Sequence, residues 1–304
     1  MLFNRKINKY YAWASDFSKN SGEGNLARLF VKKKLNSFNL KIITPKNILG
    51  NLWLTHFFDH KYTSPFVGII WCWVNFFKNR KIVYINYLPL WNFFLFLLLP
   101  PGTILGPITG GANFKKKEKG YFVRKHIFPK LYKISELLLN LRSSEIIFST
   151  SLLKNFLLKK TIKNSKFNFI FNYYKLNIKQ FKNIDILIYY RNHANKKKFF
   201  PYSLIQKLKN SQFKIYVVGD HLNIPFVKNY GKIDNIKLIN LLKRTKYSIS
   251  SDENLYSLFF MECINNHVKV ITDYSNLKKV DHFNKNFIFL NYKKIQDLNW
   301  LKKN

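Results

Sequence analysis

Three short polar segments in the second half of the sequence carry residue types suited to binding a nucleotide diphosphate. They are Arg191–Lys198, Gly219–His221 and Ser250–Asn254, and each directly follows an apolar run typical of a buried β-strand. Arginine and lysine neutralise a diphosphate, glycine lets a backbone approach a phosphate closely, and a carboxylate accepts hydrogen bonds from ribose hydroxyls. We therefore expect a nucleotide diphosphate to bind where these segments meet.

The apolar runs before these segments belong to an alternation of predicted strands and helices. The predicted strands cover residues 184–190, 214–218, 227–230, 247–250 and 268–272, and the predicted helices cover residues 202–210, 236–244 and 255–265. This alternation is typical of a parallel sheet with helices on both faces. In such a sheet a ligand binds beyond the carboxyl ends of the strands, which is where the polar segments lie.

The first half of the sequence shows the same alternation. Its predicted strands cover residues 10–17, 40–44, 82–87, 103–105, 145–149 and 168–172, and its predicted helices cover residues 25–35, 121–141 and 152–160. Gly22 and Gly24 lie in the turn after the first strand, and Gly110 and Gly111 lie in a loop after the strand at 103–105. We expect both glycine pairs to contact a phosphate group or the acceptor of a transferred group.

Together the two halves predict an α/β fold with two doubly wound parallel-sheet, Rossmann-like domains. The predicted domains are residues 1–172 and residues 184–304, of which the second would bind the nucleotide, with a polar linker at 173–183. A length of 304 residues suits two domains of about 100–200 residues each. Neither the G-x-G-x-x-G turn of dinucleotide-binding domains nor a P-loop is present in the sequence.

The composition is strongly basic, with 52 Lys and Arg against 15 Asp and Glu and a formal net charge of +37. A hydrophobic fraction of 47% excludes a disordered basic chain. The abundance of Lys, Asn, Ile and Phe is what codons rich in A and T produce, so only local clusters of charge are informative. The apolar runs at 66–77 and 82–99 are too short or too interrupted to span a membrane. The surplus charge instead suits peripheral contact with an anionic membrane surface.

The two cysteines, Cys72 and Cys263, exclude a disulfide framework and have no metal-binding spacing. Residues 1–11 lack the apolar segment of a secretory signal. We therefore expect a cytoplasmic protein, present in part at the inner face of the cytoplasmic membrane. We expect no metal ion and no other cofactor.

The order of short motifs in the second half resembles the nucleotide-binding domain of family-4-type glycosyltransferases, which have the two-domain GT-B fold. The family pattern G-R-x-x-x-x-K resembles Tyr190-Arg191 through Lys196, with tyrosine in place of glycine. The pattern V-x-G-D-G resembles residues 217–221, and S-x-x-E resembles Ser250–Glu253. The pattern E-A-x-A-x-G-x-P-V-I resembles residues 262–271 without a gap.

The resemblance implies roles for individual residues. Arg191 and Lys196 would clamp the departing diphosphate, and Glu253 would act beside them on the donor sugar. Glu262 would accept hydrogen bonds from the ribose hydroxyls. The remaining contacts to the nucleotide sugar would come from Gly219, Ser251 and Asn254; the strict family spacing between the two acids places Asn254 at the first of them.

The reaction implied by the resemblance is transfer of a sugar from a nucleotide sugar, with retention of anomeric configuration and without a metal ion. The acceptor would be a glycan or a lipid-linked saccharide in the biosynthesis of a cell-surface polysaccharide or lipopolysaccharide. The resemblance also implies that the first domain, residues 1–172, lies on the acceptor side. Peripheral contact with an anionic membrane would bring the enzyme to such an acceptor.

Three alternatives remain open from the sequence. Residues 246–262 faintly resemble the donor-site segment of fucosyltransferases, which predicts an inverting enzyme on the same fold. The family glycines after the first acid are absent, which predicts an inactive homologue. The net charge predicts a protein that binds nucleic acid or an anionic surface without catalysis. Because no RRM, helix-turn-helix or zinc-finger signature is present, we expect no specific nucleic-acid partner.

Overall fold

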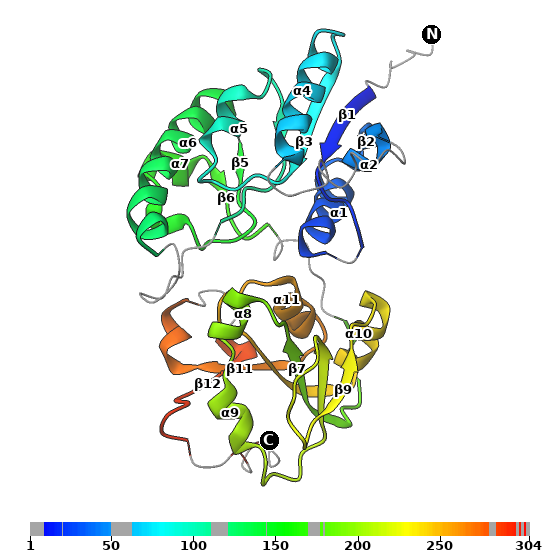
Figure 1. Cartoon of the computed structure of the whole chain (residues 1–304), viewed down its shortest axis with the longest axis vertical. Helices are drawn as coiled ribbons and strands as arrows, with labels where there is room; N and C mark the ends of the chain where they lie inside the picture. Colours follow the sequence, from blue (N-terminus) through cyan, green and yellow to red (C-terminus); the bar gives the residue numbers. More distant parts are fainter. Residues whose placement is uncertain are drawn as a thin grey trace. The chain divides into compact units, whose positions relative to one another are not determined.

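The computed structural model describes residues 9–19, 21–49, 63–110, 121–143, 145–169, 177–178, 180–279, 284–295, 298 and 301. The chain divides into two compact units, Met1–Tyr173 and Tyr174–Asn304 (Figure 1). Each unit is built around a parallel sheet, so the predicted α/β fold with two parallel-sheet domains is confirmed. The linker predicted at 173–183 lies partly outside the described residues.

A four-stranded parallel sheet forms the centre of the first unit, in the order β2-β1-β3-β4. Its strands are β1 (Lys9–Ala14), β2 (Asn39–Ile43), β3 (Lys81–Asn86) and β4 (Ile104–Leu105). β1 and β3 are central, and their last residues are fully buried, because the sheet is covered on both faces. Two short strands, β5 (Ile146–Ile147) and β6 (Ser165–Lys166), pair in parallel as a separate small sheet.

Several helices surround these strands in the first unit. They are α1 (Gly22–Lys34), α2 (Pro45–Leu49), α4 (Ser64–Phe76), α5 (Phe93–Leu98), the π-helical turn η1 (Val123–Ile127), α6 (Phe128–Arg142), the 3-10 turn η2 (Lys154–Phe156) and α7 (Lys159–Lys163). The apolar run at 66–77 is thus helix α4, and the run at 82–99 is strand β3 followed by helix α5. None of the described helices is long and apolar enough to cross a lipid bilayer.

The helix predicted at 152–160 is wrong. Only η2 and the start of α7 are helical there, and Leu158 between them is extended. The Leu158 N–H donates to the carboxylate of Glu136 at 2.6 Å instead of to the carbonyl one turn earlier. Leu153 and Leu157 are buried four residues apart, and this spacing imitates a helical period although it serves an irregular segment.

The second unit contains a six-stranded parallel sheet in the order β12-β11-β10-β7-β8-β9. Its strands are β7 (Ile184–Tyr190), β8 (Ile215–Gly219), β9 (Lys228–Gly231), β10 (Thr245–Ser250), β11 (Lys269–Asp273) and β12 (Phe287–Leu290). The chain builds from β7 towards one edge and then returns to build from β10 towards the other. β7 and β10 therefore flank a topological switch point, which is where doubly wound sheets bind ligands.

Four α-helices connect strands of this sheet among the described residues: α8 (Ala194–Lys198), α9 (Tyr202–Lys207), α10 (Asn235–Lys243) and α11 (Leu258–Asn265). Two 3-10 turns, η4 (Tyr274–Lys279) and η5 (Asn284–Asn286), lie between β11 and β12. α11 begins three residues later than the predicted helix at 255–265. The Tyr256 N–H is held by the Asn254 side chain at 2.9 Å, and Ser257 then caps the helix by accepting from the Phe260 N–H. The turn before α11 therefore extends to Ser257, three residues beyond its predicted end at Asn254.

Candidate functional site

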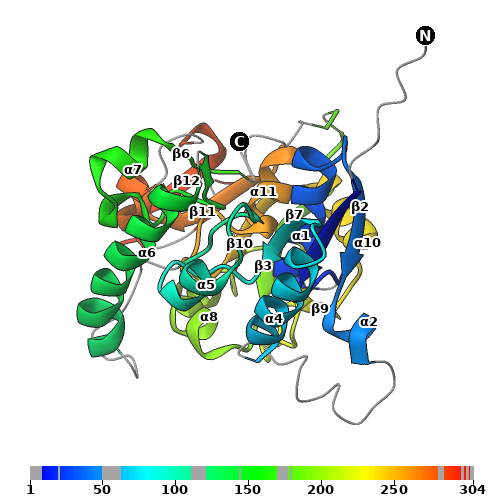
Figure 2. The same ribbon diagram turned by 90° about the horizontal axis from the view of Figure 1, so that it is seen from above.

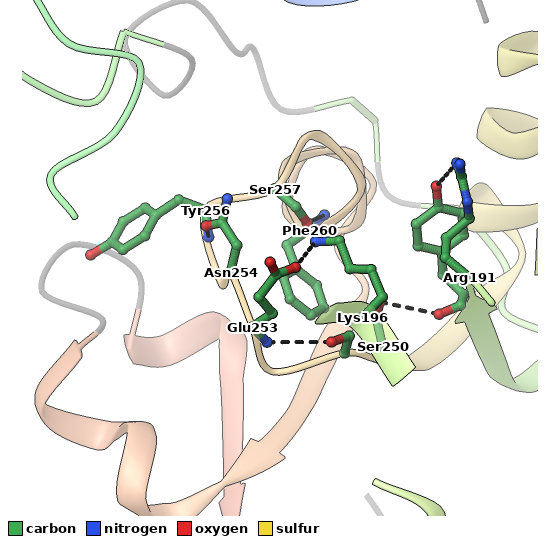
Figure 3. A network of polar contacts seen from close by, with 10 residues as sticks. Arg191, Lys196, Ser250, Glu253, Asn254, Tyr256, Ser257 and Phe260 are labelled. Carbon is green, nitrogen blue, oxygen red and sulfur yellow. Dashed lines mark hydrogen bonds and ion pairs between the residues drawn. The ribbon is translucent and has the colours of Figure 1, made fainter. Parts of the chain in front are cut away.

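The polar segments singled out in the second half converge on the carboxyl ends of β7, β8 and β10 (Figure 3). Arg191 follows β7 directly and Lys196 lies on the short helix α8. Ser251, Glu253 and Asn254 follow β10. Because β7 and β10 are hydrogen-bonded neighbours, two segments that are about 60 residues apart in sequence lie at one end of the sheet.

Arg191 and Lys232 both lie against the carboxylate of Asp220. The Arg191 Nε is 3.7 Å from Oδ2 and the Lys232 Nζ is 3.3 Å from Oδ1. The backbone N–H of Asn192 donates to Oδ2 at 2.7 Å, and this bond, with Lys232 and Arg191, lowers the pKa of Asp220. Arg191 also donates to the Tyr189 hydroxyl at 3.1 Å. Two cations thus lie around one carboxylate, and Arg191 keeps 46% of its side chain exposed.

Lys196 and Glu253 form the shortest ion pair of this edge, with Nζ 2.5 Å from Oε2. Both side chains are about two-thirds or more buried, at 32% and 25% exposure. Two residues that the sequence analysis assigned to opposite parts of the donor, the diphosphate and the sugar, therefore contact one another. Figure 3 shows the pair between the end of β7 and the segment after β10.

Gly219 ends β8 with a φ of +105°. A Cβ atom on this residue would lie 2.1 Å from the carbonyl oxygen of Tyr190. The neighbouring Asp220 N–H donates to the same carbonyl at 2.9 Å. The glycine is thus required for the close passage of the β7 and β8 ends, and that passage brings Asp220 to the Arg191 side chain.

The segment after β10 is fixed by bonds within itself and to its surroundings. The Ser251 hydroxyl accepts from the Glu253 N–H at 3.4 Å, and the Asp252 N–H donates to the Phe199 carbonyl at 3.1 Å. Asp252 turns inward and accepts from the Thr272 hydroxyl at 2.8 Å. Burial raises the pKa of Asp252 to about 6. Asp252 therefore anchors the segment, and Glu253 is the acid that faces the cations.

Glu262 is the fifth residue of α11 and is half-buried. A rise of about 1.5 Å per residue places it roughly 6 Å along the helix from Leu258. Its backbone carbonyl accepts from the Asn266 side chain at 2.7 Å. Glu262 therefore lies about one helical turn beyond the start of α11.

The turn after β1 holds a second group of polar residues, and sequence reasoning noted only its glycines. The Asp16 carboxylate accepts hydrogen bonds from the Ser18 N–H at 2.9 Å, from the Ser21 hydroxyl, and from the Tyr87 hydroxyl at 3.4 Å. The Asn86 amide at the end of β3 exchanges hydrogen bonds with the backbone of Asp16, at 2.8 and 3.2 Å. Asp16 is therefore held by hydroxyl and amide donors.

Glu23 brings a second carboxyl to this turn. Its Oε2 atom is buried and makes no hydrogen bond within the described residues. Burial, with a further contribution from the Asp16 charge, raises the pKa of Glu23 to about 7. In the sequence, the position of Glu23 between two glycines at the start of a predicted helix is the pattern that could have indicated its role.

The two glycines of the turn differ in their surroundings. Gly24 is buried, its N–H is taken by the Ser21 hydroxyl at 2.8 Å, and a Cβ there would lie 2.2 Å from the Ser18 carbonyl. Nothing lies within 4 Å of a Cβ on Gly22. Gly24 therefore serves the packing of the turn, and its N–H is not available to a phosphate.

Of the second predicted glycine pair, Gly110 is described and Gly111 lies outside the described residues. A Cβ on Gly110 would meet the Leu153 side chain at 2.7 Å. Among the described residues, no group of three or more His, Cys, Asp or Glu side chains is arranged to hold a metal ion. Both cysteines are free and buried, and burial raises the pKa of Cys263 to about 12.

The arrangement of strands and helices is similar to that of solved structures. The crystal structure of Anabaena Alr3699/HepE in complex with UDP and glucose aligns with a TM-score of 0.50 at 13% identity, over 97% of this chain and 89% of that one. The apo form of the lipopolysaccharide outer core galactosyltransferase WaaB gives 0.46 at 10% identity, over 88% and 80% of the two chains. E. coli heptosyltransferase WaaC with ADP gives 0.32 at 8% identity, over 88% and 87%. No protein-family model and no curated protein sequence matches the chain.

The chain thus has the two-unit α/β fold of the HepE structure. This is the GT-B fold that the motifs of the second half implied.

Proposed function

We propose that this protein is a glycosyltransferase that moves a sugar from a nucleotide-sugar donor to a glycan or a lipid-linked saccharide. The observation that supports this most is the group of cations and acids at the switch point of the second sheet: Arg191, Lys196 and Lys232 with Asp220 and Glu253. The fold is shared with a protein whose structure holds UDP and glucose.

In this proposal Arg191 and Lys196 stabilise the diphosphate as it leaves the sugar, because negative charge develops on it in the transition state. Both cations now face carboxylates. A diphosphate would take the place of Asp220 at Arg191, which costs little because exposed ion pairs are worth about 0–1 kcal/mol. At Lys196 the diphosphate would displace Glu253, and the freed carboxylate could then accept hydrogen bonds from hydroxyls of the donor sugar.

Glu262 would accept hydrogen bonds from the ribose hydroxyls, while Ser251 and Asn254 would contact the donor from the segment after β10. These roles follow the family resemblance. Gly219 would act indirectly, since it lets β7 and β8 approach and so places Asp220 against Arg191.

We assign the acceptor to the turn after β1. Two carboxyls, Asp16 and Glu23, make this turn a poor site for a phosphate and a good one for sugar hydroxyls, which donate hydrogen bonds. Gly22 remains open to a ligand there, because nothing crowds its Cα. The acceptor would belong to a cell-surface polysaccharide or lipopolysaccharide pathway, at the cytoplasmic face of an anionic membrane.

We further propose that the reaction needs no metal ion, because arginine and lysine supply the charge that neutralises the diphosphate. Excess EDTA should then leave the initial rate unchanged, and a lost rate that magnesium restores would refute this point. The family resemblance implies retention of configuration, and an NMR measurement of the product anomer decides between retention and inversion.

The proposal is tested by donor binding and turnover. A thermal-shift screen of nucleoside diphosphates and nucleotide sugars should raise the melting temperature of the protein for one base, and calorimetry should then give a Kd. Glu262→Gln should weaken that binding, whereas Glu145→Gln is the matched control, because Glu145 pairs with Lys34 and Lys166 in the other unit. Release of nucleoside diphosphate in the presence of a membrane-glycan extract then reports transfer.

Two results would overturn the assignment. Absence of binding to every nucleotide, together with salt-dependent affinity for duplex DNA, would favour a nucleic-acid-binding protein. Donor binding without turnover on any acceptor would favour an inactive homologue.

A further inference from the structure

The surface of helices α4, α5 and α6 differs from the rest of the described surface in its apolar character. Figures 1 and 2 both draw the three helices side by side in the first unit. The π-helical turn η1 directly precedes α6 in the chain. Of the 20 large apolar side chains that are exposed among the described residues, 13 belong to these helices, to η1, to the residue before η1 or to the residue that ends α4. They are Phe66, Ile70, Val74, Phe77, Phe94, Leu97, Leu98, Phe122, Val123, Ile127, Ile134, Leu137 and Leu141.

The exposed residues on α4 follow a helical period. Phe66, Ile70, Val74 and Phe77 are spaced by four, four and three residues, and they are 47–75% exposed. Ile69 and other residues of the opposite side are buried in the core of the unit. α4 contains no charged residue, so it is apolar on both sides, although only one side is covered.

α6 repeats this arrangement with η1. Its exposed stripe runs through Ile127, Ile134, Leu137 and Leu141, which are 40–76% exposed, while Tyr132 and Leu139 on the opposite side are buried. α5 adds Phe94, Leu97 and Leu98 in a helix that also lacks charge. Three adjacent helices thus each have an apolar stripe that the described residues leave exposed.

Hydrogen bonds hold the three helices together. The indole N–H of Trp73 on α4 donates to the Leu98 carbonyl of α5 at 2.7 Å. The guanidinium of Arg142 at the end of α6 donates to the carbonyls of Phe96 and Leu97 at 2.5 and 3.1 Å. Because these bonds cross from helix to helix, the three helices are held next to one another. We call their exposed apolar stripes together the α4–α5–α6 face.

The charge around this face has a single sign. Residues 63–110 and 121–143 contain one acidic residue, Glu136, and its side chain is fully buried. Lys78 lies beyond the end of α4, and Lys125, Lys130 and Lys133 lie on η1 and α6; all four are exposed. Within residues 63–110 and 121–143, the apolar surface is bordered by lysines and has no exposed carboxylate. Such a surface is complementary to an anionic bilayer, whose acyl region accepts the apolar groups and whose headgroups attract the lysines.

A hollow beside α4 and α5 adds to this surface. Its volume is about 380 Å³, and Phe66, Trp91 and Phe94 are among the residues that line it. Phe66 and Phe94 belong to the α4–α5–α6 face as well. The face is therefore not flat, and it offers a hydrocarbon chain a place to enter.

From the apolar stripes and the single-sign border we infer that the α4–α5–α6 face is a docking surface for a membrane that contains anionic phospholipids. The inference concerns a surface of the first unit and does not depend on nucleotide-sugar binding. A soluble partner or a second copy of the chain would cover the apolar stripes equally well. A second copy would not account for a border of lysines without a carboxylate among the described residues, since two such faces would repel each other. A soluble partner would need an acidic rim around its own apolar patch, whereas an anionic bilayer supplies both the apolar region and the negative charge.

The experiment measures binding of the full chain to vesicles by flotation, without any nucleotide. Vesicles of phosphatidylcholine alone are compared with vesicles that contain about one-third phosphatidylglycerol. The wild-type protein should bind the anionic vesicles. The triple variant Ile70→Gln, Phe77→Gln, Leu141→Gln should bind them at least about tenfold more weakly, because each exposed apolar side chain adds to insertion.

A matched control triple places the same substitution at exposed apolar residues of the second unit: Ile178→Gln, Phe181→Gln and Ile236→Gln, which are 89%, 85% and 74% exposed. It should bind like wild type. The double variant Lys130→Gln, Lys133→Gln should lose about fivefold in affinity for each lysine, whereas Lys209→Gln, Lys214→Gln should lose less. Circular dichroism melts establish that the variants fold.

Two outcomes would overturn the inference. The first is that the face variant binds anionic vesicles as tightly as wild type, or that the control triple loses as much affinity for them as the face variant does. The second is a pair of observations. Light scattering shows a concentration-dependent dimer of the wild type that the face variant does not form, and the wild type does not bind vesicles. Calorimetric binding of the donor nucleotide by the face variant keeps this test separate from the proposed transfer, because that site lies in the other unit.

Discussion

The carboxyl ends of the two sheets carry acids in both units, but the acids have different partners. In the second unit, Asp220 and Glu253 each face cations, at 2.5–3.7 Å. In the first unit, Asp16 is bound by hydroxyl and amide donors, and the Glu23 Oε2 has no hydrogen-bond partner among the described residues. The same position in a parallel sheet therefore presents two different chemistries.

This difference teaches how one fold can hold two kinds of substrate. Cations that are loosely paired with carboxylates can exchange those partners for a diphosphate. Carboxyls that are surrounded by neutral donors favour further hydroxyl groups, and they repel a phosphate. This contrast is the basis for proposing a donor at the second sheet and an acceptor at the first. Four substitutions test it.

Glu23→Gln should produce the largest change. For this acid the pKa in the folded state, about 7, lies above its ordinary value of 4.5, so the folded protein keeps a proton that the unfolded chain releases. The wild type should therefore lose stability as the pH rises from about 4.5 to 7. The variant should be more stable at pH 8 by roughly 2–3 kcal/mol and about equal at pH 4.

Urea unfolding of both proteins across this pH range measures the effect. Asp252 contributes in the same direction through its own raised pKa, so some pH dependence should remain in the variant. If the free energy of unfolding depends on pH in the same way for both proteins, Glu23 has an ordinary pKa. The acids at the two sheet edges would then not differ in the way described above.

Gly24→Ala should cost about 2 kcal/mol, because the added Cβ would meet the Ser18 backbone at 2.2 Å and the turn must shift. Gly22→Ala is its control in the same turn. Nothing crowds that position, so alanine should leave stability unchanged or raise it by up to about 1 kcal/mol. Thermal unfolding compares the two, and equal effects would refute the packing role of Gly24.

Arg191→Ala should weaken binding of the donor nucleotide about tenfold, at the lower end of the 1.5–3 kcal/mol that a charged hydrogen bond contributes. The lower end applies because the side chain is 46% exposed. Calorimetry measures the loss, and Arg244→Ala serves as a control, since Arg244 bonds Asn183 at the opposite end of the strands. Unchanged affinity of the Arg191→Ala variant would show that the donor does not bind at this edge of the sheet.

Lys232→Gln should have the smallest effect, below about 1 kcal/mol on stability, because its side chain is 78% exposed. It should weaken donor binding less than Arg191→Ala does, and added salt should reduce the difference between the two variants. If Lys232→Gln loses more affinity for the donor than Arg191→Ala does, then Lys232, and not Arg191, contributes more to binding the diphosphate.

The sequence predicted most elements of the fold because their apolar patterns are strong. β7 has the predicted bounds, Ile184–Tyr190, because the apolar run Ile186–Tyr190 is too short for a helix and is followed by polar residues, a pattern typical of a buried strand. The helix predicted at 152–160 was wrong because leucines four residues apart serve an irregular segment there. β12 was missed, since its four residues, Phe287–Leu290, follow no helical pattern that would mark a further α/β unit.

The candidate site was predicted where single residues follow strands directly, as Arg191 follows β7. The pairing of Lys196 with Glu253 could not be predicted, because it depends on β7 and β10 being neighbours rather than on any local pattern. Asp16 and Glu23 were not predicted as site residues, although Glu23 stands between the two glycines that were. The raised pKa of Glu23 comes from burial, which no spacing in the sequence reveals.

The strand order of the second unit also has a consequence for how the protein is made. β7 pairs with β10, and the Ser248 hydroxyl on β10 donates to the Leu187 carbonyl on β7, 61 residues earlier. The ribosome must therefore release about 60 residues after β7 before the central strand pair of this sheet can close. Contacts of such long range slow folding and leave apolar strand edges open to aggregation. Yield during expression should consequently depend more on temperature and chaperones than the final stability of the sheet would indicate.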